Sequence, residues 1–597
     1  MHKHYDIVIC GGTGCMSSKS ILIKEAFDTI LKAKGLADKV HIYMSGCFGL
    51  CEKGPVVIIY PDQTFYVHIN KDYVEEIIDS HLINGKIVEK LAYYEFDDVT
   101  KQKVYKSFQE MAFYHNQERI ALRNCGIIDP YNIEEYIARD GYFALAKSLG
   151  LPPDEVIQII IDSGLRGRGG GGFPTGLKWQ FASKYKGGES FVICNADEGD
   201  PGAFMDRAIL EGDSHSVIEA MIINGYAIGA HQGYVYVRAE YPLAVKRLKH
   251  AIKEAYAYGL LGKNIMESGF DFDLEIRLGA GAFVCGEETA LIASIEGERG
   301  MPRNKPPFPA QKGLWGRPTI INNVETYANI PVIILKGAAW FNEIGTERSK
   351  GTKVFALGGK IKNTGLLEVP MGTTLRHVIY DIGGGIPNNR KFKAVQTGGP
   401  SGGCLTEDDL DTPIDYDNLI KKGSMMGSGG MIVMDEDNCM VDVAKFYMEF
   451  IVEESCGKCT PCREGTRRLY ELLEKISEGK GTLETLEELK QLAKDVQDTS
   501  LCGLGQSAPN PILSTLEKFH DEYVEHVVDK KCRAGVCKAL TKLYITEKCI
   551  GCTKCARNCP VGCISGELRK LHRIDTDKCI KCNACLHHCP VHAIIHV

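Results

Sequence analysis

Short apolar runs and helical repeats divide the chain into segments of different character. Runs at residues 7–9, 41–44 and 56–60 predict strands near the start of the chain. Between the first two runs, apolar positions recur at helical spacing, at Ile21, Leu22, Ala26 and Ile30. This pattern predicts a small domain of strands and helices over residues 1–90.

The middle of the chain has the pattern of a larger α/β domain. An apolar run at residues 191–194 predicts a strand, and residues 220–237 predict an amphipathic helix followed by a strand. We therefore expect an α/β domain at 115–345. It follows a linker at 91–114, whose polar stretch from Asp97 to Gln109 predicts a helix. Short strands and glycine turns from Lys353 to Leu405 predict a small β-rich domain at 350–435.

The C-terminal third begins with helical repeats. Three of them have apolar residues at helical spacing: Val443, Phe446, Tyr447 and Phe450; Leu469, Leu472, Leu473 and Ile476; and Leu483, Leu486, Leu489 and Leu492. A fourth helix is expected after Pro511. We predict a four-helix bundle over 436–540 and a separate domain over 541–597, which makes the fold class a multidomain combination of α/β and α+β.

Composition excludes several classes of function. The 597 residues carry a net charge of −7, which gives no reason to expect nucleic-acid binding or an anionic membrane surface. Neither a signal peptide nor a membrane span is expected, so the chain is predicted to be cytoplasmic. The outlier is the count of 24 cysteines. Because the cytosol keeps thiols reduced, clustered cysteines in such a chain indicate metal binding.

The last fifty or so residues contain two copies of one cysteine motif. Each is C-x2-C-x2-C-x3-C followed by proline, the run typical of bacterial ferredoxins, in which the fourth cysteine ligates the other cluster. The first predicted [4Fe–4S] cluster therefore has the ligands Cys549, Cys552, Cys555 and Cys589. The second has Cys559, Cys579, Cys582 and Cys585. A zinc ribbon is the alternative, but zinc needs only four ligands. Cys563 is surplus and is expected to be a buried thiol.

The first ninety residues contain two further cysteine pairs, Cys10 with Cys15 and Cys47 with Cys51. Each pair follows a strand-like run, and glycines beside Cys10 allow a tight loop. The arrangement resembles the thioredoxin-like [2Fe–2S] ferredoxins. The alternative is a redox dithiol, but that chemistry favours C-x-x-C spacing.

The bundle has a cysteine triple of spacing C-x2-C-x2-C, at Cys456, Cys459 and Cys462, and Cys502 is the expected fourth ligand of a [4Fe–4S] cluster. If the helices run up and down, the start of the first and the end of the fourth meet at the other end of the bundle. That end would bring together Cys439, His526, Cys532 and Cys537, a donor set suited to structural zinc. Free buried cysteines are the open alternative. Cys125, Cys194, Cys285 and Cys404 lack metal-ligand spacing and are expected to be inert.

The middle domain contains a glycine loop with cations at residues 166–178 and polar groups after a strand at residues 195–202. Glycine loops let backbone N–H groups approach a phosphate. Further segments lie at 279–289, 303–308 and 322–326. Together these segments resemble the NADH-binding, FMN-carrying flavoprotein subunit of respiratory complex I and of NAD-linked hydrogenases, over roughly residues 115–525.

The resemblance implies specific contacts. FMN contacts fall on Gly167, Arg168, Gly169, Lys178, Asn195, Asp197, Glu198, Phe283, Gly286, Glu287, Asn322 and Asn323. NAD(H) contacts fall on Phe173, Phe181, Asp200, Glu288, Lys305 and Phe308. No acid–base catalyst is implied, because hydride passes at the flavin, with Glu198 and Glu288 positioning the reactants. For the three phenylalanines, ordinary core packing is the alternative. Glu288 would repel a 2′-phosphate, which favours NAD over NADP.

The resemblance also implies a β-grasp insert at 350–435. Three residues depart from the family pattern, Asp200 for Glu, Phe283 for Tyr and Val324 for Thr, and each puts one contact in doubt.

A [2Fe–2S] head and a two-cluster tail on one chain are similar to the beta subunit of electron-bifurcating [FeFe]-hydrogenases of anaerobes. That resemblance implies a diaphorase subunit with FMN, one [2Fe–2S] and three [4Fe–4S] clusters, coupling H2, NAD and ferredoxin. The implied partners are a hydrogenase catalytic subunit, a small thioredoxin-like [2Fe–2S] subunit and ferredoxin, in a hetero-oligomer for which a dimer of heterotrimers is one arrangement. The alternatives are the diaphorase of an NAD-linked formate dehydrogenase, a hydrogenase that reduces NAD(P) without bifurcating, and a subunit that only conducts electrons.

Overall fold

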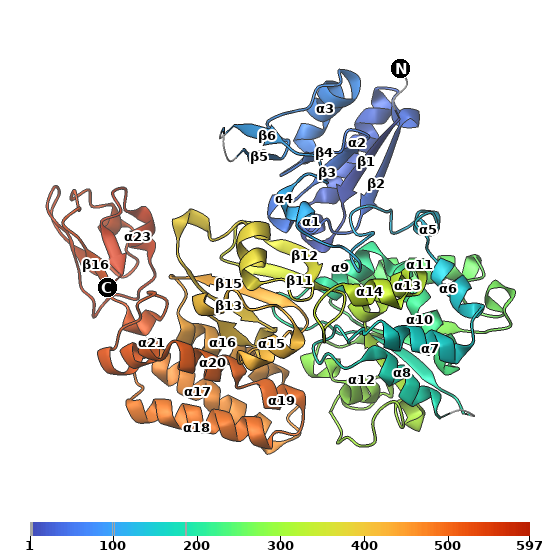
Figure 1. Cartoon of the computed structure of the whole chain (residues 1–597). Helices are drawn as coiled ribbons and strands as arrows, with labels where there is room; N and C mark the ends of the chain where they lie inside the picture. The colour runs from blue at the N-terminus through green and yellow to red at the C-terminus, as the bar shows by residue number, and fades with distance from the viewer. Residues whose placement is uncertain (1–3, 98–99, 101, 186–187, 597) are drawn as a thin grey trace. The chain divides into compact units, whose positions relative to one another are not determined.

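The computed structural model describes residues 4–97, 100, 102–185 and 188–596. The chain forms two compact units, residues 1–390 with 394–433 and residues 391–393 with 434–597 (Figure 1). Within the described residues, no helix combines the length and the apolar character needed to cross a bilayer.

The first unit begins with a four-stranded sheet of order β2-β1-β3-β4. Its strands are β1 (Tyr5–Cys10), β2 (Val40–Ser45), β3 (Val57–Tyr60) and β4 (Thr64–Tyr66), with β1 parallel to β2 and antiparallel to β3. The helices are α1 (Thr13–Ser17), α2 (Ser20–Ala33) and α3 (Val74–Ile77). The helix predicted after Cys15 is present as α2, but Ile21 and Leu22 are exposed, and the helix buries Ile23, Phe27 and Leu31 instead.

The helix predicted between Asp97 and Gln109 is wrong for the described part of that stretch. Residues 98, 99 and 101 lie outside the described residues. On either side of them, β5 (Tyr94–Phe96) pairs with β6 (Lys103–Tyr105) as an antiparallel hairpin, followed by α4 (Ala112–His115). Tyr94, Phe96 and Tyr105 are aromatic residues that favour strands.

The α/β domain is built on a parallel sheet of order β10-β7-β8-β9. The strands are β7 (Phe191–Ala196), β8 (Gln232–Arg238), β9 (Asp273–Gly279) and β10 (Thr319–Asn323). The helices are α5 (Ile133–Ile137), α6 (Phe143–Leu149), α7 (Pro153–Asp162), α8 (Thr175–Ser183), α9 (Met205–Gly212), α10 (Ser214–Ile228), α11 (Pro242–Ala257), α12 (Glu288–Ile295), α13 (Val324–Lys336) and α14 (Ala338–Glu343). The predicted helix and strand at 220–237 are present as α10 and β8.

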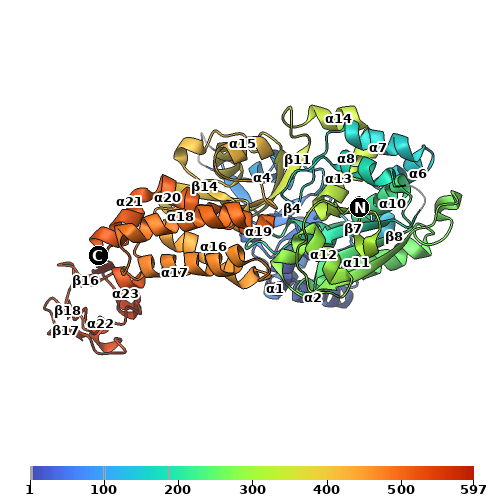
Figure 2. The same cartoon turned by 90° about the horizontal axis from the view of Figure 1, so that it is seen from below.

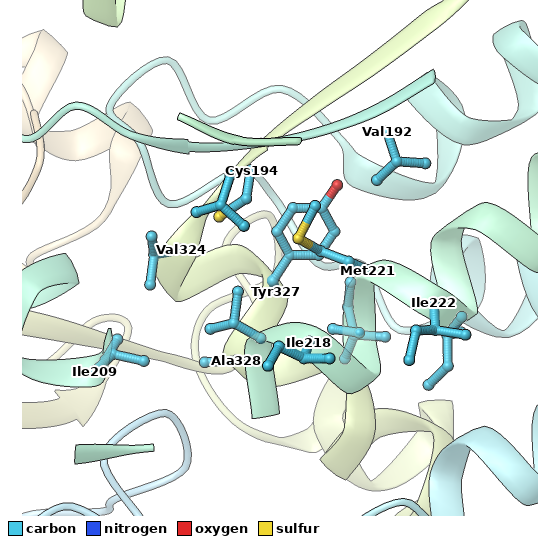
Figure 3. Close-up of a cluster of buried hydrophobic side chains, with 14 of the residues drawn as sticks. Val192, Cys194, Ile209, Ile218, Met221, Ile222, Val324, Tyr327 and Ala328 are labelled. Atoms are coloured by element: carbon cyan, nitrogen blue, oxygen red, sulfur yellow. The ribbon is translucent and has the colours of Figure 1, made fainter. Parts of the chain in front are cut away.

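The core of this domain lies between the sheet and helices α9, α10 and α13. Figure 3 shows Val192 and Cys194 of β7 packed near Ile218 and Met221 of α10 and Tyr327 of α13. Helix α10 is buried along nearly its whole length, so the amphipathic character predicted for it is wrong: the polar residues Glu219 and Asn224 are buried as well. This core fixes the carboxyl ends of the strands, where the polar segments lie.

A mixed five-stranded sheet of order β12-β11-β15-β13-β14 occupies the region of the expected β-grasp insert. Its strands are β11 (Thr352–Gly359), β12 (Gly365–Pro370), β13 (Phe392–Thr397), β14 (Gly403–Leu405) and β15 (Gly430–Asp435), with α15 (Tyr416–Lys421) between the last two.

The second unit contains a helical bundle of α16 (Met440–Glu454), α17 (Thr466–Ser477), α18 (Leu483–Thr499) and α20 (Asn510–Lys518), followed by α21 (His520–Val524). Figure 2 shows the helices side by side: α16 packs against α17 and α20, and α18 packs against the same two helices. The short helix α19 (Gly503–Ser507) precedes α20. The four predicted helices are present, but Phe446 and Leu483, expected inside, are exposed, and α16 buries Val441, Ala444 and Met448.

The tail repeats one small unit twice. Strand β16 (Leu543–Ile545) pairs with β19 (Ile594–His596), and β17 (Ile564–Ser565) pairs with β18 (Arg573–Ile574). Each half has one short helix, α22 (Lys554–Arg557) or α23 (Ala584–His588). The core is small, and three of its eight buried residues are cysteines.

Candidate functional site

Polar side chains gather at the carboxyl ends of two adjacent parallel strands, where α/β proteins bind ligands. Strands β7 and β10 pair so that Asn195 lies opposite Asn323. Asn195 Nδ2 donates to the carbonyl oxygen of Gly286 at 2.9 Å, and Asn323 Nδ2 donates to Asp206 Oδ2 at 2.5 Å. Asn322 is buried, and its side-chain oxygen, in the orientation that satisfies both amide atoms, accepts from Trp179 Nε1 at 3.0 Å. The structure thus brings these predicted residues together and fixes their orientation.

The glycine loop lies between α7 and α8 and is pressed against the protein at two points. A Cβ at Gly172, where φ is +61°, would lie 2.7 Å from the ring of Tyr416. A Cβ at Gly169 would lie 3.1 Å from Asn323 Cβ. At Gly171 no atom lies within 4 Å of the equivalent position. The loop is therefore held on one side and open on the other, which suits a backbone cradle for a phosphate.

The side chain of Arg168 does not point toward a position where it could contact a phosphate. The residue is fully buried, and its guanidinium donates to the carbonyl oxygens of Arg166, Lys350 and Thr352. The bonds to Lys350 and Thr352 hold the loop onto the start of β11, and the bond to Arg166 lies within the loop. The Arg168 side chain is therefore turned away from a ligand in the loop, whereas Arg166 Nε donates to the carbonyl oxygen of Gly172 within the loop, and Lys178 lies on α8, which follows it.

Two lysines and two glutamates form a charged group beside the strand ends. Lys178 Nζ lies 2.6 Å from Glu288 Oε1, and Lys305 Nζ lies 3.0 Å from Glu287 Oε1 and 3.7 Å from Glu288 Oε2. Burial opposes ionisation of Glu288, but the two lysine charges outweigh it and lower the pKa of that carboxyl. Glu287 also accepts from the backbone N–H groups of Thr289 and Ala290 at the start of α12. The group has both signs of charge available to a ligand.

The three phenylalanines that the family resemblance assigns to nucleotide contacts are not core residues. Phe173, Phe181 and Phe308 are 48, 43 and 53% exposed, so the alternative of ordinary core packing is wrong. By contrast, Trp179 on the same helix as Phe181 is fully buried. Half-exposed aromatic rings beside charged groups offer stacking faces for a ring-containing ligand.

Buried acids surround the strand ends. Burial raises the pKa of Asp200 to about 6 and raises that of Glu198. The carboxylate of Glu198 accepts from the backbone N–H groups of Asp206 and Arg207 at 3.1 and 3.2 Å. Phe283 approaches the same segment, because a Cβ at Gly199 would lie 2.9 Å from its ring.

The buried ion pair of Lys353 and Glu325, both almost fully inaccessible, was not predicted from the sequence. Glu325 Oε1 also accepts from the N–H of Val354, which ties α13 to β11. A lysine directly before the apolar run at 354–357 was the available signal.

The cysteines of the first ninety residues line one cavity: Cys10, Cys15, Cys47 and Cys51. Close contacts between the two loops require glycine. A Cβ at Gly12 would lie 2.8 Å from Cys47 Cβ, and one at Gly54 would lie 2.8 Å from Cys15 Sγ. Four thiols around one cavity fit the predicted iron–sulfur cluster, and the ligand assignment stays a prediction.

Two further residues absent from the sequence analysis hold these loops against the α/β domain. Arg247 of α11 is buried and donates to the carbonyl oxygens of Gly11, at 3.1 Å, and Ser45, at 3.3 Å. Glu211 of α9 accepts from the N–H of Thr13 at 3.0 Å. Neither residue belongs to a sequence motif, so no pattern in the sequence predicts that they contact these loops.

The four bundle cysteines lie at one end of the helices. Cys456 and Cys459 follow α16, Cys462 lies just before α17, and Cys502 precedes α19. The loop of Cys502 reaches Cys462, because a Cβ at Gly505 would lie 3.1 Å from Cys462 Cβ. Burial, together with the neighbouring thiols Cys459, Cys502 and Cys456, raises the pKa of Cys462 to about 11. The positive charge of bound iron would instead lower this pKa and favour the thiolate.

In the tail, the eight predicted ligands line two separate cavities. One has Cys549, Cys552, Cys555 and Cys589 in its wall. The other has Cys559, Cys579, Cys582 and Cys585. The fourth cysteine of each motif thus lies with the triple of the other motif, as a two-cluster ferredoxin requires.

The opposite end of the bundle brings together Cys439, His526, Cys532 and Cys537. Their ligand atoms all lie within 4.8 Å of one another, and all four residues are buried. His526 Nδ1 bonds to the carbonyl oxygen of Glu522 at 2.6 Å, which leaves Nε2 3.4 Å from the sulfurs of Cys439 and Cys537. A carbonyl partner on the second ring nitrogen is the usual support of a metal-binding histidine. Cys125, Cys194, Cys285 and Cys404 are buried elsewhere.

The chain is similar to known proteins over most of its length. Residues 160–332 match the family of the Nuo51 FMN-binding domain, 442–526 the NADH-ubiquinone oxidoreductase-F iron–sulfur binding region, and 544–597 the 4Fe-4S dicluster domain. The HndC subunit of the NADP-reducing hydrogenase of Solidesulfovibrio fructosivorans is 64% identical over 76% of this chain and 93% of its own length. The F 2 subunit of the NADH-quinone oxidoreductase of Rhizobium meliloti is 46% identical over 70% of this chain and 99% of its own.

A solved structure agrees with these relatives. A chain of an NAD⁺-reducing [NiFe]-hydrogenase in the H2-reduced state matches with a TM-score of 0.61 and 30% identity, over 88% of this chain and 85% of that one. The matched FMN-binding region contains the glycine loop, Lys178, Asn195 and Asn323, and the two matched iron–sulfur regions contain the bundle cysteines 456–502 and the eight tail cysteines assigned to clusters. This chain therefore belongs to the family of complex I 51 kDa, or NADH-quinone oxidoreductase F, subunits, and it is an NADH-dehydrogenase-type FMN and iron–sulfur oxidoreductase subunit of hydrogenase or complex I-like enzymes.

Proposed function

We propose that this chain is the NAD(H)-oxidising and -reducing subunit of a hydrogenase complex in which H2, NAD and ferredoxin are coupled. The observation that carries the proposal is the combination on one chain of an open glycine loop beside half-exposed aromatic rings with cysteine sets in four places. The chain would hold FMN, one [2Fe–2S] cluster at the thioredoxin-like head and three [4Fe–4S] clusters.

The residues divide into two binding roles. The open loop around Gly171 and the ammonium of Lys178 would hold the FMN phosphate, with Asn195 and Asn323 fixed nearby by their own hydrogen bonds. When bound, the flavin supplies the change from two-electron hydride transfer to one-electron transfer. Phe173, Phe181 and Phe308 would stack on the rings of NAD(H), and Lys305 would meet its pyrophosphate. Glu198 and Glu288 position the reactants, and no proton transfer is required of them.

Anaerobic reduction of viologen by NADH tests this activity in the isolated chain. We expect activity after reconstitution with FMN and iron. Absence of activity in fully reconstituted protein would contradict the proposal and would favour a chain that only conducts electrons.

The preference between NAD and NADP is proposed on charge. Glu288 stays ionised, and it would repel a 2′-phosphate while accepting a ribose hydroxyl hydrogen. Lys178 and Lys305 offset part of this charge, so the preference is expected to be moderate. KM values for NADH and NADPH in the wild type and in Glu288→Gln measure it: the substitution should lower KM for NADPH relative to KM for NADH. An unchanged ratio would exclude Glu288 as the discriminating residue.

Coupling to ferredoxin is proposed for the tail, whose two cavities lie at the end of the chain away from the flavin segments in sequence. The expected partners are an [FeFe]-hydrogenase catalytic subunit and a small thioredoxin-like [2Fe–2S] subunit, in the cytoplasm. In the purified complex, H2-dependent reduction of NAD should require oxidised ferredoxin. Reduction at full rate without ferredoxin would exclude bifurcation.

A second candidate is a hydrogenase that reduces NADP without bifurcating. It is favoured by the 64% identity to a subunit of an NADP-reducing hydrogenase. The ferredoxin requirement separates the two candidates. A diaphorase of an NAD-linked formate dehydrogenase is distinguished by co-purification, which would then recover a molybdenum or tungsten subunit instead of a hydrogenase subunit.

We also propose that Cys439, His526, Cys532 and Cys537 hold a structural zinc ion. Support comes from the four buried ligand atoms, which lie within 4.8 Å of one another. Metal analysis should find one zinc per chain in wild type and in the control Cys404→Ala, and none in Cys537→Ala. Zinc-free wild type would end the proposal.

A further inference from the structure

The two cavities of the tail differ by one thiol. The wall of the second contains Cys563 in addition to Cys559, Cys579, Cys582 and Cys585, so five cysteines face it. The first is lined by four. A [4Fe–4S] cluster takes four thiolates, so the second cavity has one sulfur more than its cluster needs.

Cys563 is held next to one ligand in particular. Its sulfur lies 3.4 Å from that of Cys559, and the residue is 5% exposed. Its backbone is fixed at the start of β17, because its carbonyl oxygen accepts from the N–H of Asp575 at 2.8 Å. The thiol therefore reaches the cavity from a rigid position and can approach the same iron corner as Cys559 by a side-chain rotation.

The repeat in the tail provides a reference for this position. Cys563 follows Cys559 by four residues, and the residue four after Cys589 is Ala593. Ala593 is fully buried, and its N–H points to Cys589 Sγ at 3.2 Å. The same location beside the fourth ligand thus holds a thiol in one half and a methyl group in the other.

From this difference we propose that Cys563 is a reserve ligand of the second tail cluster, able to replace Cys559. The exchange is redox-neutral: the Cys563 thiol gives up its proton and forms an Fe–S bond, the Fe–S bond of Cys559 breaks, and the Cys559 thiolate takes the proton. Cys559 is the more exposed of the two and therefore more open to oxidants, whereas Cys563 is protected by burial. The proposal rests on the ligand set proposed above.

The test uses the full chain, prepared anaerobically, and measures iron, acid-labile sulfide and the EPR and Mössbauer spectra rather than activity. We expect Cys559→Ala and Cys563→Ala each to retain all four clusters. The double variant Cys559→Ala/Cys563→Ala should lose one [4Fe–4S] cluster or convert it to a three-iron cluster. Equal loss in Cys559→Ala and the double variant would overturn the proposal.

The other half supplies a matched control. Cys589→Ala should lose the first tail cluster, because Ala593 offers no sulfur, and Cys589→Ala/Ala593→Cys should regain it. If the double variant Cys559→Ala/Cys563→Ala retains every cluster, neither cysteine is a required ligand. That outcome would contradict the proposed ligand set and the reserve role together, whereas equal loss in Cys559→Ala and the double variant contradicts the reserve role alone. If Cys563→Ala alone loses the cluster, Cys563 is the resident ligand and the reserve role is overturned.

Discussion

The flavin region, residues 166–178, 195–200, 286–288, 305–308 and 322–323, differs from the cysteine sets in how its polar groups are satisfied. In the flavin region they bond to other protein groups: Lys178 to Glu288, Asn195 to Gly286, and Asn323 to Asp206. In the cysteine sets they face one another, as in the pairs Cys47–Cys51 at 4.0 Å and Cys439–Cys537 at 3.7 Å.

The difference concerns what each site requires to form. A flavin region whose charges are already paired can fold before its ligand arrives. Thiolates that face one another repel at these distances unless a metal ion lies between them. We therefore expect the flavin region to be preorganised and the cysteine sets to depend on metal.

Iron depletion should produce the largest effect. The tail has a core of only eight buried residues, three of them cysteines, which is too small to hold the domain together without clusters. In iron-free full-length protein, amide hydrogen exchange should show residues 544–597 unprotected and 160–332 still protected. Retained protection in the tail would contradict the expectation that its cysteine sets depend on metal. Lost protection at 160–332 would contradict the expectation that the flavin region is preorganised.

Removing the positive charge of Lys178 tests the flavin region, which we expect to be preorganised. Lys178→Met should weaken FMN binding about 10- to 100-fold, since a charge-assisted hydrogen bond to a phosphate contributes about 1.5–3 kcal/mol. Fluorescence titration of the apoprotein with FMN measures this. Lys253→Met, an exposed lysine of α11, is the control and should bind FMN as the wild type does. Equal affinity in Lys178→Met would remove Lys178 from the phosphate site.

The exposed aromatics should matter for the nucleotide and not for the fold. Phe308→Ala should raise KM for NADH about 10-fold, because an aromatic stacking contact contributes roughly 1–2 kcal/mol. Its melting temperature should match the wild type, since the ring is half exposed. Phe272→Ala, in the core, should instead lower stability by about 3–5 kcal/mol. A drop in the melting temperature of Phe308→Ala would indicate a packing role.

The smallest effect is expected from the buried acid Asp200. Its pKa of about 6 in the fold lies above the value of about 3.9 in an unfolded chain, so the folded state holds a proton longer as pH rises. Stability from this group is present below about pH 4 and is lost between about pH 4 and 6, by at most about 3 kcal/mol.

In Asp200→Asn this loss should be absent. The change in melting temperature from pH 5 to pH 8 should therefore be more positive in the variant than in the wild type. The exposed Asp154→Asn on α7 serves as the control. Identical pH dependence in wild type and Asp200→Asn would mean that the carboxyl is hydrated.

Local motifs made much of the chain predictable. Cysteine spacing predicted the iron–sulfur ligand sets, because short loops that wrap a cluster depend on residues near one another in sequence, whereas the proposed zinc set was predicted from the direction of the bundle helices. Apolar periodicity predicted α2, α10 and three of the bundle helices, and Pro511 indicated the fourth. Periodicity placed exposed residues inside in three helices: Ile21 and Leu22 of α2, Phe446 of α16 and Leu483 of α18. Apolar residues on both faces of a helix leave the choice to its neighbours.

Other features could not be read from local sequence. The guanidinium of Arg168 turns to the carbonyl oxygens of Lys350 and Thr352, about 180 residues away in sequence. The hairpin at β5 and β6 replaced an expected helix in a polar stretch with weak periodicity.

The sequence by itself determined the kinds of chemistry available: thiols in sets of four, a glycine loop with a lysine, and aromatic residues near acids. Tertiary structure alone decided which of them meet. It brought Arg247 to the carbonyl oxygens of Gly11 and Ser45, paired Lys353 with Glu325 inside the core, and left Phe173, Phe181 and Phe308 half exposed. The physical reason is that spacing constrains neighbours along the chain, whereas burial and charge pairing depend on residues that only the packed fold brings together.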